Sequence, residues 1–587
     1  MKSLLRRLRG RMGVAFEAQL VRVSGAEALP QLAVLGILCG LLAAVVMIAF
    51  RVVIEFAQAA LLPPGSPENY EGLSITARFA FPLVGVLIIG AIFHRLSAAA
   101  RNVGPVHVLE RLAYHQGRLP LKSAIVQFVG AAVAIVAGLS VGREGPAIHL
   151  GAASASLAGQ HLRLPNNSLR ILVGCGVAAA IAASFNTPLA GVAFAMEVVL
   201  MEYTVVGFAP VILAAVSATA LTHIAYGSAP AFAVPPVILK SVWELPYVLG
   251  MGLIIGILAA AFIFIVDNTA RRTRSWSFWT RALLVGVVTG LCAYPAPQIM
   301  GIGYDTVGST LLGNVAITAL LAIIVFKLLA TGLTIGMGMP GGLIGPLVVI
   351  GAAAGSALGA FGHWIAPDSV SSPALYALIG LGAMMAGALH APLAALTAML
   401  ELTGNPNIIW PGMLAVIAAY GMSRVAFGQQ PIFITLMRAR GLDYHNDPVV
   451  QSLRRVGVGA VMTTNVLTLP RRATGAAIDT ALAYSPAWVL VLDGDKPKAL
   501  LPAMDLARQR TEAPDAGNFD LLEVPADRLE IAPIALQATL QEARDAMDAG
   551  GTEALYVVRP LTYDGTPSYG IVTRADVNKA YQYGGLA

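Results

Sequence analysis

One carboxylate in this chain stands in a setting that favours chemistry. Glu144 lies in the run Gly-Arg-Glu-Gly-Pro at 142–146, flanked by glycines and close to Pro146. Proline is favoured at the first turn of a helix, so a helix is predicted to start at the glutamate and to continue from Ala147. Free N–H groups at a helix start favour negative charge. Glu144 would then fill an anion site when ionised and leave it when protonated. Helix capping, or pairing with Arg143, is the structural alternative.

The amino-acid composition indicates whether this glutamate lies in a water-soluble protein or in a membrane protein. Hydrophobic residues make up 57% of the 587 residues and charged residues only 12%, about half of the ~25% usual in soluble domains. So little charge cannot cover so much apolar side chain in water. The composition therefore predicts a multi-span membrane protein, in which a buried carboxylate is costly and functional by default.

Charge density divides the chain. Charged residues form about 21% of 451–587 and about 9% of the remainder, so only the tail approaches a soluble composition. We expect a basic N-terminus (1–29), a membrane domain (30–445) and a water-facing tail (446–587). The N-terminal segment carries a basic cluster that places it in the cytoplasm by the positive-inside rule: Lys2, Arg6, Arg7, Arg9 and Arg11. The basic residues form no stripe with aromatics, which excludes nucleic acid as a partner.

The membrane part contains an internal repeat. Gly-Pro at 145–146 and at 345–346 are each followed, five residues after the proline, by Gly-Ala-Ala. Pro-Leu-Ala at 188–190 precedes Glu197 by nine residues, and the same triplet at 392–394 precedes Glu401 by nine. Two matched pairs in the same order predict a duplicated unit. Several apolar segments are short or interrupted, which suggests discontinuous helices around a midplane site.

Three motifs together resemble the CLC family of chloride channels and proton-coupled chloride exchangers: Gly-Arg-Glu-Gly-Pro at 142–146, Gly-Gly-Leu-Ile-Gly-Pro at 341–346 and Phe-Asn-Thr-Pro-Leu-Ala-Gly at 185–191. The resemblance spans roughly residues 30–440. It implies an all-α polytopic domain of two inverted repeats with tilted, partly spanning helices, and a homodimer in the lipid bilayer with one pore per subunit. A multi-pass cell-membrane location follows, in a bacterial inner membrane, with both termini cytoplasmic.

The same resemblance assigns roles to single residues. Glu144 matches the external gating glutamate, which blocks the anion path and takes up protons. Gly145 matches the first anion-coordinating helix start. Leu343 and Ile344 lie at the second such start, where the family usually has phenylalanine in place of Ile344.

Three positions depart from the family pattern. Asn102 stands where a serine usually contacts the anion; an amide can still donate to an anion, with different size and geometry. Phe433 replaces a pore-lining tyrosine and so lacks a hydroxyl donor. Val198 replaces the internal proton acceptor of exchangers. The transported ion is chloride or a similar small inorganic anion, and selectivity and coupling remain open: proton-coupled exchange, or a passive voltage- or pH-gated channel.

The remaining polar and sulfur-containing residues have structural interpretations. Glu197 and Glu401 are expected to accept structural hydrogen bonds, and His149 to pack. The three cysteines show no metal-ligand spacing, and no metal site is expected. The sequence holds no HExxH motif and no phosphate-binding Gly-x-x-x-x-Gly-Lys-Ser/Thr loop, so we expect no catalytic residue, no required cofactor and no enzyme activity.

The tail resembles a pair of CBS domains, small α/β units. Short apolar strands at 487–492 and 554–558 are each followed by a second strand and then by a helix opening with an aspartate, Asp505 or Asp576. Thr573 and Asp576 match the positions that hold ribose in nucleotide-binding members, which implies adenine nucleotide as a ligand. A purely structural pair that stabilises the dimer is the alternative.

Overall fold

The structure is a computed structural model of the 587-residue chain. It describes residues 28–65, 68–202, 205–232, 237–367, 370–442, 448–514, 516–559 and 568–584. The basic cluster at the N-terminus lies outside these ranges.

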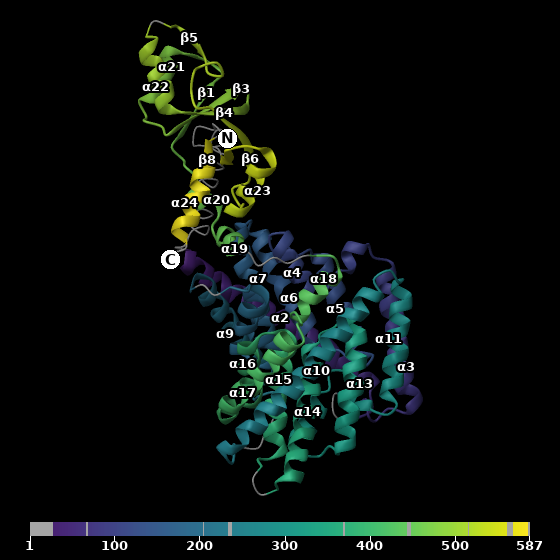
Figure 1. The fold of residues 1–587 in the computed structure, drawn as a ribbon. Coiled ribbons are helices and arrows are strands. Elements are labelled where there is room, and N and C mark those ends of the chain that lie inside the picture. The colour runs from purple at the N-terminus through teal and green to yellow at the C-terminus, as the bar shows by residue number, and fades with distance from the viewer. Residues whose placement is uncertain are drawn as a thin grey trace. The chain divides into compact units, whose positions relative to one another are not determined.

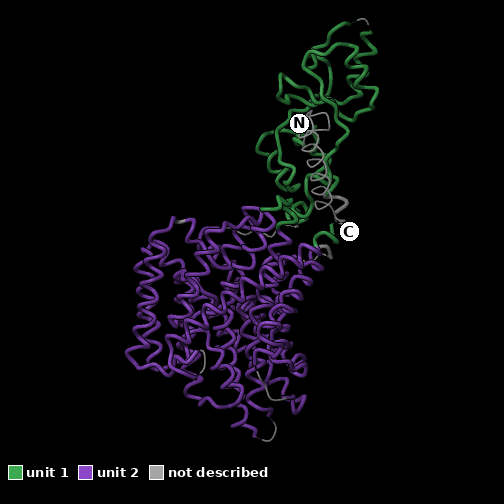
Figure 2. Tube along the Cα trace, turned by 180° about the vertical axis from the view of Figure 1, so that it is seen from behind, with its two compact units in different colours: residues 1–32, 161–169, 445–587 green, residues 33–160, 170–444 purple. Residues whose placement is uncertain are grey.

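The chain divides into two compact units, coloured separately in Figure 2. The larger unit holds residues 33–160 and 170–444. The smaller holds residues 1–32, 161–169 and 445–587, so the segment between two membrane helices belongs with the tail. Nothing in the sequence pattern indicated that assignment. We call them the membrane unit and the tail unit.

The membrane unit is helical, as predicted (Figure 1). Its elements are α2 (Leu29–Leu61), α3 (Ile75–His94), η2 (Ala98–Arg101), α4 (Pro105–Tyr114), α5 (Leu121–Val136), α6 (Glu144–His161), α7 (Asn166–Phe185), α8 (Pro188–Phe194), η3 (Ala195–Leu200), α9 (Val205–Tyr226), η4 (Val242–Glu244), α10 (Leu245–Arg272), α11 (Phe278–Ala293), η5 (Pro297–Ile299), α12 (Tyr304–Leu311), α13 (Ile317–Gly336), α14 (Ile344–Ile365), α15 (Pro373–Leu389), α16 (Pro392–Thr403), η6 (Pro406–Ile408), α17 (Ile409–Gly421), η7 (Met422–Ala426) and α18 (Ile432–Ala439).

Eight helices of the described part are long and apolar enough to cross a membrane. Others are too short to span, among them α4, α8, α12 and α18. A short helix can lie within a membrane only if neighbouring protein satisfies the backbone groups at its ends. The multi-pass helical fold class is therefore confirmed, including the interrupted helices that the sequence suggested.

The two copies of the repeat meet at their signature glycines. Gly142 and Gly342 form an antiparallel bridge, with N–H to carbonyl oxygen distances of 2.7 and 2.8 Å. They occupy equivalent positions in the two copies. A reciprocal antiparallel pair between equivalent residues is what a local twofold axis produces, as an inverted repeat requires.

A second reciprocal contact joins the copies through their acidic residues. The Glu401 carboxylate accepts the N–H groups of Leu189 and Ala190, each at 2.8 Å. The Glu197 carboxylate accepts those of Leu393 and Ala394, at 3.1 and 2.7 Å. Each glutamate thus satisfies the free amides at the start of α8 or α16 in the other copy. The predicted structural role of both glutamates is confirmed.

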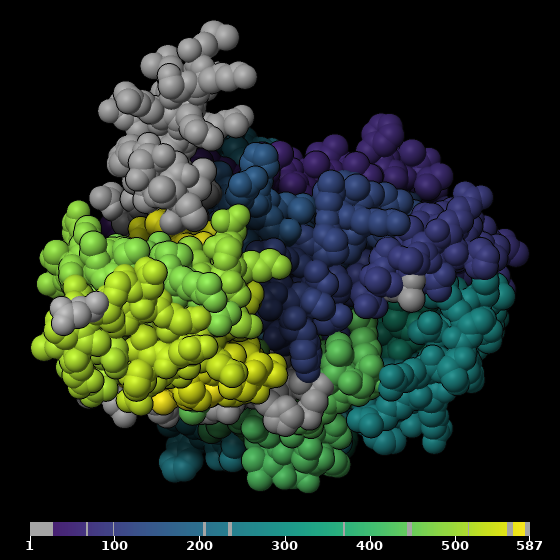
Figure 3. Space-filling view, turned by 90° about the horizontal axis from the view of Figure 1, so that it is seen from above, coloured from purple at the N-terminus to yellow at the C-terminus, as the bar shows by residue number. Residues whose placement is uncertain are grey.

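The tail unit is an α/β structure with a six-stranded sheet and a two-stranded sheet of β2 and β5, and its residues from 448 on show as the yellow-green surface in Figure 3. Its elements are α19 (Pro448–Arg455), α20 (Val458–Val461), β1 (Val466–Pro470), β2 (Arg472–Thr474), α21 (Gly475–Leu482), β3 (Trp488–Asp493), β4 (Lys496–Pro502), α22 (Ala503–Glu512), β5 (Asn518–Asp520), β6 (Leu529–Ile534), α23 (Leu540–Gly550), β7 (Ala554–Arg559), β8 (Ser568–Thr573) and α24 (Arg574–Gly584).

The sheet repeats one pattern twice. Its strand order is β1-β3-β4-β6-β7-β8. The first strand of each half pairs parallel with the second, which pairs antiparallel with the third; β4 and β6 join the halves. The predicted strands at 487–492 and 554–558 are present as β3 and β7, and a helix with Asp505 or Asp576 in its first turn follows each hairpin. The duplicated architecture is confirmed; the CBS identity stays a prediction.

The reciprocal caps predict a stability effect. Glu401→Ala leaves two amides at the start of α8 without their acceptor, because lipid offers none. Hydrogen bonds to charged groups contribute about 1.5–3 kcal/mol each in soluble proteins and about half of that or less in membranes. We expect a lowered thermal unfolding midpoint in detergent, with Glu401→Gln losing less because it keeps one acceptor oxygen. Equal midpoints for Glu401→Ala and the unchanged protein would contradict the capping role.

Candidate functional site

Two helix starts face each other across the glycine bridge. Helix α6 begins at Glu144, as the sequence predicted, and α14 begins at Ile344 with Leu343 as its N-cap residue. Both starts present N–H groups that the first turn of a helix cannot pair. Because the Gly142–Gly342 bridge lies directly before both, the positive ends of two helix dipoles point into one small region.

The Glu144 carboxylate occupies this region. Its side chain is only 2% exposed. A Cβ built on Gly142 would lie 1.9 Å from its Oε2, one on Gly342 3.0 Å from Oε2, and one on Gly345 2.9 Å from Oε1. Glycine at these three positions therefore makes the room that the carboxylate fills, and all three belong to the two helix starts.

The two oxygens of this carboxylate have different partners. Oε1 accepts a hydrogen bond from the Tyr304 hydroxyl at 2.7 Å. Oε2 is buried and has no hydrogen-bond partner among the described residues. An anionic oxygen beside helix N-termini is stabilised by their amides and dipoles without a direct bond. The arrangement favours negative charge between the two helix starts, and the protein's own carboxylate supplies that charge.

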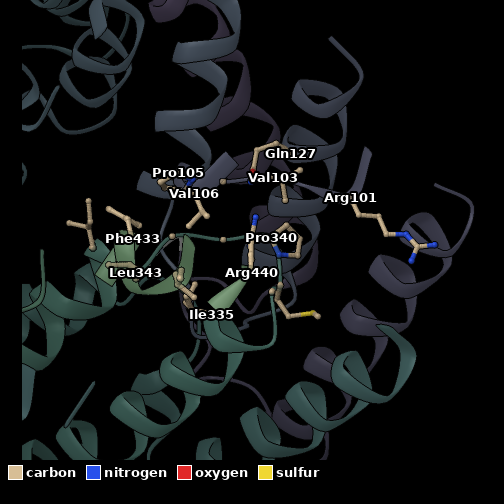
Figure 4. Close-up of a pocket in the computed structure, with 18 residues that line it drawn as sticks. Arg101, Val103, Pro105, Val106, Gln127, Ile335, Pro340, Leu343, Phe433 and Arg440 are labelled. Carbon is tan, nitrogen blue, oxygen red and sulfur yellow. The ribbon is translucent and has the colours of Figure 1, made fainter. Parts of the chain in front are cut away.

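A small cavity approaches this site from one side (Figure 4). Four of the five predicted anion contacts line it: Gly145, Leu343, Ile344 and Phe433. Asn102 does not; its neighbours Arg101 and Val103 do. Contact of Asn102 with an anion stays a prediction. The absence of Asn102 from the residues that line this cavity does not support it.

Arginine adds positive charge to this cavity, which sequence reasoning missed. Arg440 follows α18 and lines the cavity, and its Nη1 is buried without a hydrogen-bond partner among the described residues. Arg101 also belongs to the lining, but its guanidinium donates to the Leu96 and His94 carbonyls and extends away in Figure 4. Arg440 is therefore the cation that faces the cavity.

One buried polar side chain bonds the backbone at the start of α4, beside the cavity. His149 is fully buried, and its Nδ1 accepts the Gly104 N–H at 3.1 Å and lies 3.3 Å from Oε1 of Gln127. An accepting Nδ1 belongs to a neutral imidazole. This histidine supports the backbone, which agrees with the packing role expected for it.

A second, apolar cavity reaches Glu144 from another direction. Glu144, Tyr304 and Thr187 are the polar members of a lining that is otherwise hydrophobic. Ile344 lines both cavities, and Phe194 of this one meets Phe433 of the other edge to face, with ring centroids 6.4 Å apart. Glu144 thus lines the apolar cavity, and the first cavity is lined by residues next to it, among them Gly145 and Gly342.

Three further residues around the gate escaped the sequence analysis. Tyr304 contacts Glu144 directly. Glu68, in the loop before α3, accepts the Gly303 N–H at 2.9 Å and the Tyr304 N–H at 3.3 Å. Lys327 of α13 is fully buried and donates to the Ile299 and Gly301 carbonyls at 3.1 and 3.3 Å. Of these three residues, Lys327 is the one that the sequence could have marked, because a lysine inside an apolar helix is unusual.

The remaining predicted positions line neither of the two cavities beside Glu144. Val198 is buried within η3, so no carboxylate stands at the internal acceptor position. Thr573 and Asp576 bond each other in the tail: the Thr573 hydroxyl donates to Asp576 Oδ2 at 2.7 Å, and the Asp576 N–H donates to the hydroxyl oxygen at 3.2 Å. This pair caps α24. Cys39, Cys175 and Cys292 are buried free thiols, as expected.

Fold and site together define a class: a multi-span membrane protein whose broken helices surround an anion site occupied by a glutamate. Residues 85–424 match the family described as "Voltage gated chloride channel". A putative chloride channel protein, ClcB-like, from Ralstonia nicotianae is 30% identical over 398 residues, which cover 66% of this chain and 92% of that protein. The chain belongs to this family, whose members transport chloride.

Other relatives and solved structures agree with the assignment. An H⁺/Cl⁻ exchange transporter, ClcA, from Vibrio vulnificus is 27% identical over 326 residues, 53% of this chain and 68% of that protein. A slow cyanobacterial Cl⁻/H⁺ antiporter superimposes with a TM-score of 0.62 at 22% identity, over 70% of this chain and 98% of that one. A eukaryotic CLC transporter gives a TM-score of 0.58 at 21% identity over 94% of this chain and 98% of that one. The structures show the fold, in the last case including the tail.

The glycine contacts generate a structural prediction. Gly142→Ala places a methyl group where the Glu144 carboxylate lies, so the carboxylate is expected to leave the site in an experimentally determined structure. Gly308→Ala is the matched control, because a Cβ on Gly308 meets nothing within 4 Å. That control should leave Glu144 in place and be neutral or slightly stabilising, as alanine is within helices. An unmoved carboxylate in Gly142→Ala would refute the assigned position.

Proposed function

We propose that this protein transports chloride through a pathway gated by Glu144. The observation that carries the proposal is the position of the Glu144 carboxylate between two helix starts, at the end of a cavity lined by Gly145, Leu343, Ile344 and Phe433. A carboxylate and a halide carry the same charge, so the site that accepts one suits the other. Protonation removes that charge, and the neutral side chain gives up the site to an entering anion.

The charges near the pathway support anion transport over cation transport. Arg440 faces the cavity, and the guanidinium of Arg143 lies beside the gate, 4.8 Å from the Phe185 ring centre and 5.4 Å from that of Tyr304. In a low-dielectric region these charges raise the local anion concentration and exclude cations. Phe433 adds no hydroxyl donor, so the helix amides supply the main polar contacts.

We further propose that transport is coupled to proton counter-movement. Glu144 lines an apolar cavity, and the residues next to it line a separate cavity that carries polar and basic groups. Separate approaches let an anion and a proton use the same glutamate without sharing a path. Water within the apolar cavity would carry the proton, since Val198 provides no acceptor. The passive channel is the second candidate, and the apolar Val198 favours it.

Vesicles with crossed gradients separate the two candidates. The purified protein is reconstituted, and the reversal potential is measured while chloride and pH gradients are varied independently. Coupling predicts that the reversal potential moves with the pH gradient. A reversal potential that stays at the chloride equilibrium value would establish the channel instead.

Removing the ionisable group tests the gate itself. Glu144→Gln cannot ionise, so we expect chloride flux without proton movement and without the acid activation that protonation of Glu144 gives the unchanged protein. Asp267→Asn is the matched control, because Asp267 pairs with Arg271 at 2.7 Å and lines neither of the two cavities beside Glu144. Proton pumping by Glu144→Gln would show that Glu144 is not the gate.

We also propose a homodimer in the lipid bilayer with cytoplasmic termini, and binding of adenine nucleotide to the tail at Thr573 and Asp576. Support for the nucleotide comes from the duplicated sheet and from the hydroxyl and carboxylate that meet at the start of α24. These are groups that can bond ribose hydroxyls once the pair opens.

Nucleotide binding can be measured by calorimetry on the full-length protein. Asp576→Asn is expected to weaken ATP binding about tenfold, which corresponds to ~1.4 kcal/mol. Asp505→Asn is the matched control, because the first copy has Pro502 where the second has Thr573. The absence of ATP binding by the unchanged protein would leave the tail with a structural role only.

A further inference from the structure

One contact at the gate joins the two halves of the membrane unit. The Tyr304 hydroxyl donates to Glu144 Oε1 at 2.7 Å, across 160 residues of sequence. Among the described residues, Tyr304 donates the one side-chain hydrogen bond to this carboxylate. The other carboxylate oxygen, Oε2, has no hydrogen-bond partner among them. A phenol O–H to carboxylate bond is charge-assisted and roughly twice as strong as a neutral one. Tyr304 therefore acts on the ionised form of Glu144.

The surroundings of Tyr304 fix the direction of its hydroxyl. The ring meets Phe185 and Phe232 edge to face, with centroids 6.0 and 5.5 Å apart. The Arg143 guanidinium lies 5.4 Å from the ring centre. These contacts keep the hydroxyl of the Tyr304 ring directed at the Glu144 carboxylate.

Charged side chains also hold the backbone below this ring. Lys327 donates to the Ile299 and Gly301 carbonyls, and Glu68 accepts the N–H groups of Gly303 and Tyr304. Gly301 and Gly303 have φ values of +60° and +86°, which suit glycine and let the chain bend tightly before α12. Tyr304 is thus anchored independently of the carboxylate that it contacts.

We propose that Tyr304 is a latch that holds ionised Glu144 in the anion site and so sets how easily the gate opens. The latch rests on the gating role proposed above for Glu144. The hydroxyl donates strongly to a carboxylate and weakly to a protonated carboxyl group, so the bond favours the ionised, closed position. Protonation weakens the bond at the same moment as it removes the charge that the helix starts attract. Tyr304 is a positioning residue: it needs no contact with the anion.

The other charged groups near Glu144 define what the test must keep constant. They are Arg143 beside it, Glu68 and Glu71 in the loop before α3, Asp305 in α12 and Lys327 in α13. Burial and the nearby Asp305 raise the pKa of Glu71 to about 7, so this group titrates in the range of the measurement. Tyr304→Phe removes one oxygen and leaves all five groups in place.

The test is the pH dependence of chloride efflux from vesicles containing the full-length protein. Tyr304→Phe destabilises only the ionised, closed state, so half-activation should move to higher pH by about 1 unit, the tenfold equivalent of a lost charged hydrogen bond. Tyr376→Phe is the matched control: its hydroxyl donates to the Glu244 carboxylate at 2.5 Å, in a cluster apart from the gate. A half-activation pH in Tyr304→Phe that is unchanged, or shifted to lower pH, would overturn the latch.

A double variant separates failure of the latch from failure of the gate. With Glu144→Gln as background, Tyr304→Phe should shift nothing further, while any residual titration of Glu71 remains in both. Acid activation that survives Glu144→Gln would refute the gating role itself. Loss of activation in Glu144→Gln together with an unshifted Tyr304→Phe would refute the latch alone. A shift by Tyr304→Phe within the Glu144→Gln background would show that Tyr304 acts through another group.

Discussion

The two hydrogen bonds between Gly142 and Gly342 are the interaction on which the anion site depends. In a bilayer, backbone groups at broken helix ends have no water to bind, so each break must be paired with protein. The bridge pairs the two breaks with each other. It thereby brings two sets of unpaired helix amides to one place, where they favour negative charge. The need to satisfy the backbone and the capacity to bind an anion have the same origin.

Reciprocal hydrogen bonding between the two copies also occurs elsewhere in the membrane unit. Glu197 and Glu401 each cap a short helix of the other copy. Such contacts make either copy incomplete alone, since its helix starts would lie in lipid without acceptors. They also give a structural reason for an acidic residue at each of these equivalent positions in an otherwise apolar sequence. Burial of a carboxylate is therefore insufficient to identify a gate. The groups that the carboxylate contacts distinguish a structural role from a gating role.

Sequence reasoning succeeded where a motif is local and failed where a contact is distant. Glu144, Gly145, Leu343 and Ile344 lie within short runs whose glycines and prolines mark helix starts, so both helix starts could be predicted, together with three of the residues that line the cavity. Tyr304 follows an unremarkable bend, and its contact spans 160 residues. Arg440 lies at the end of a helix with no spacing that relates it to the gate. Asn102 shows the opposite error, because adjacency along the chain does not place a side chain in the lining.

The partners of Glu144 explain how one site can hold either a side chain or an ion. A carboxylate fixed by a salt bridge would be hard to release, because separating paired charges inside a protein is strongly unfavourable. Here the nearest cation, Arg143, donates instead to the Ser184 carbonyl at 2.7 Å. Helix amides and one phenol supply the attraction, so the ionised side chain is held by dipoles of moderate strength. In the proposed gating cycle, an incoming halide takes the place of the carboxylate beside the helix amides without breaking an ion pair.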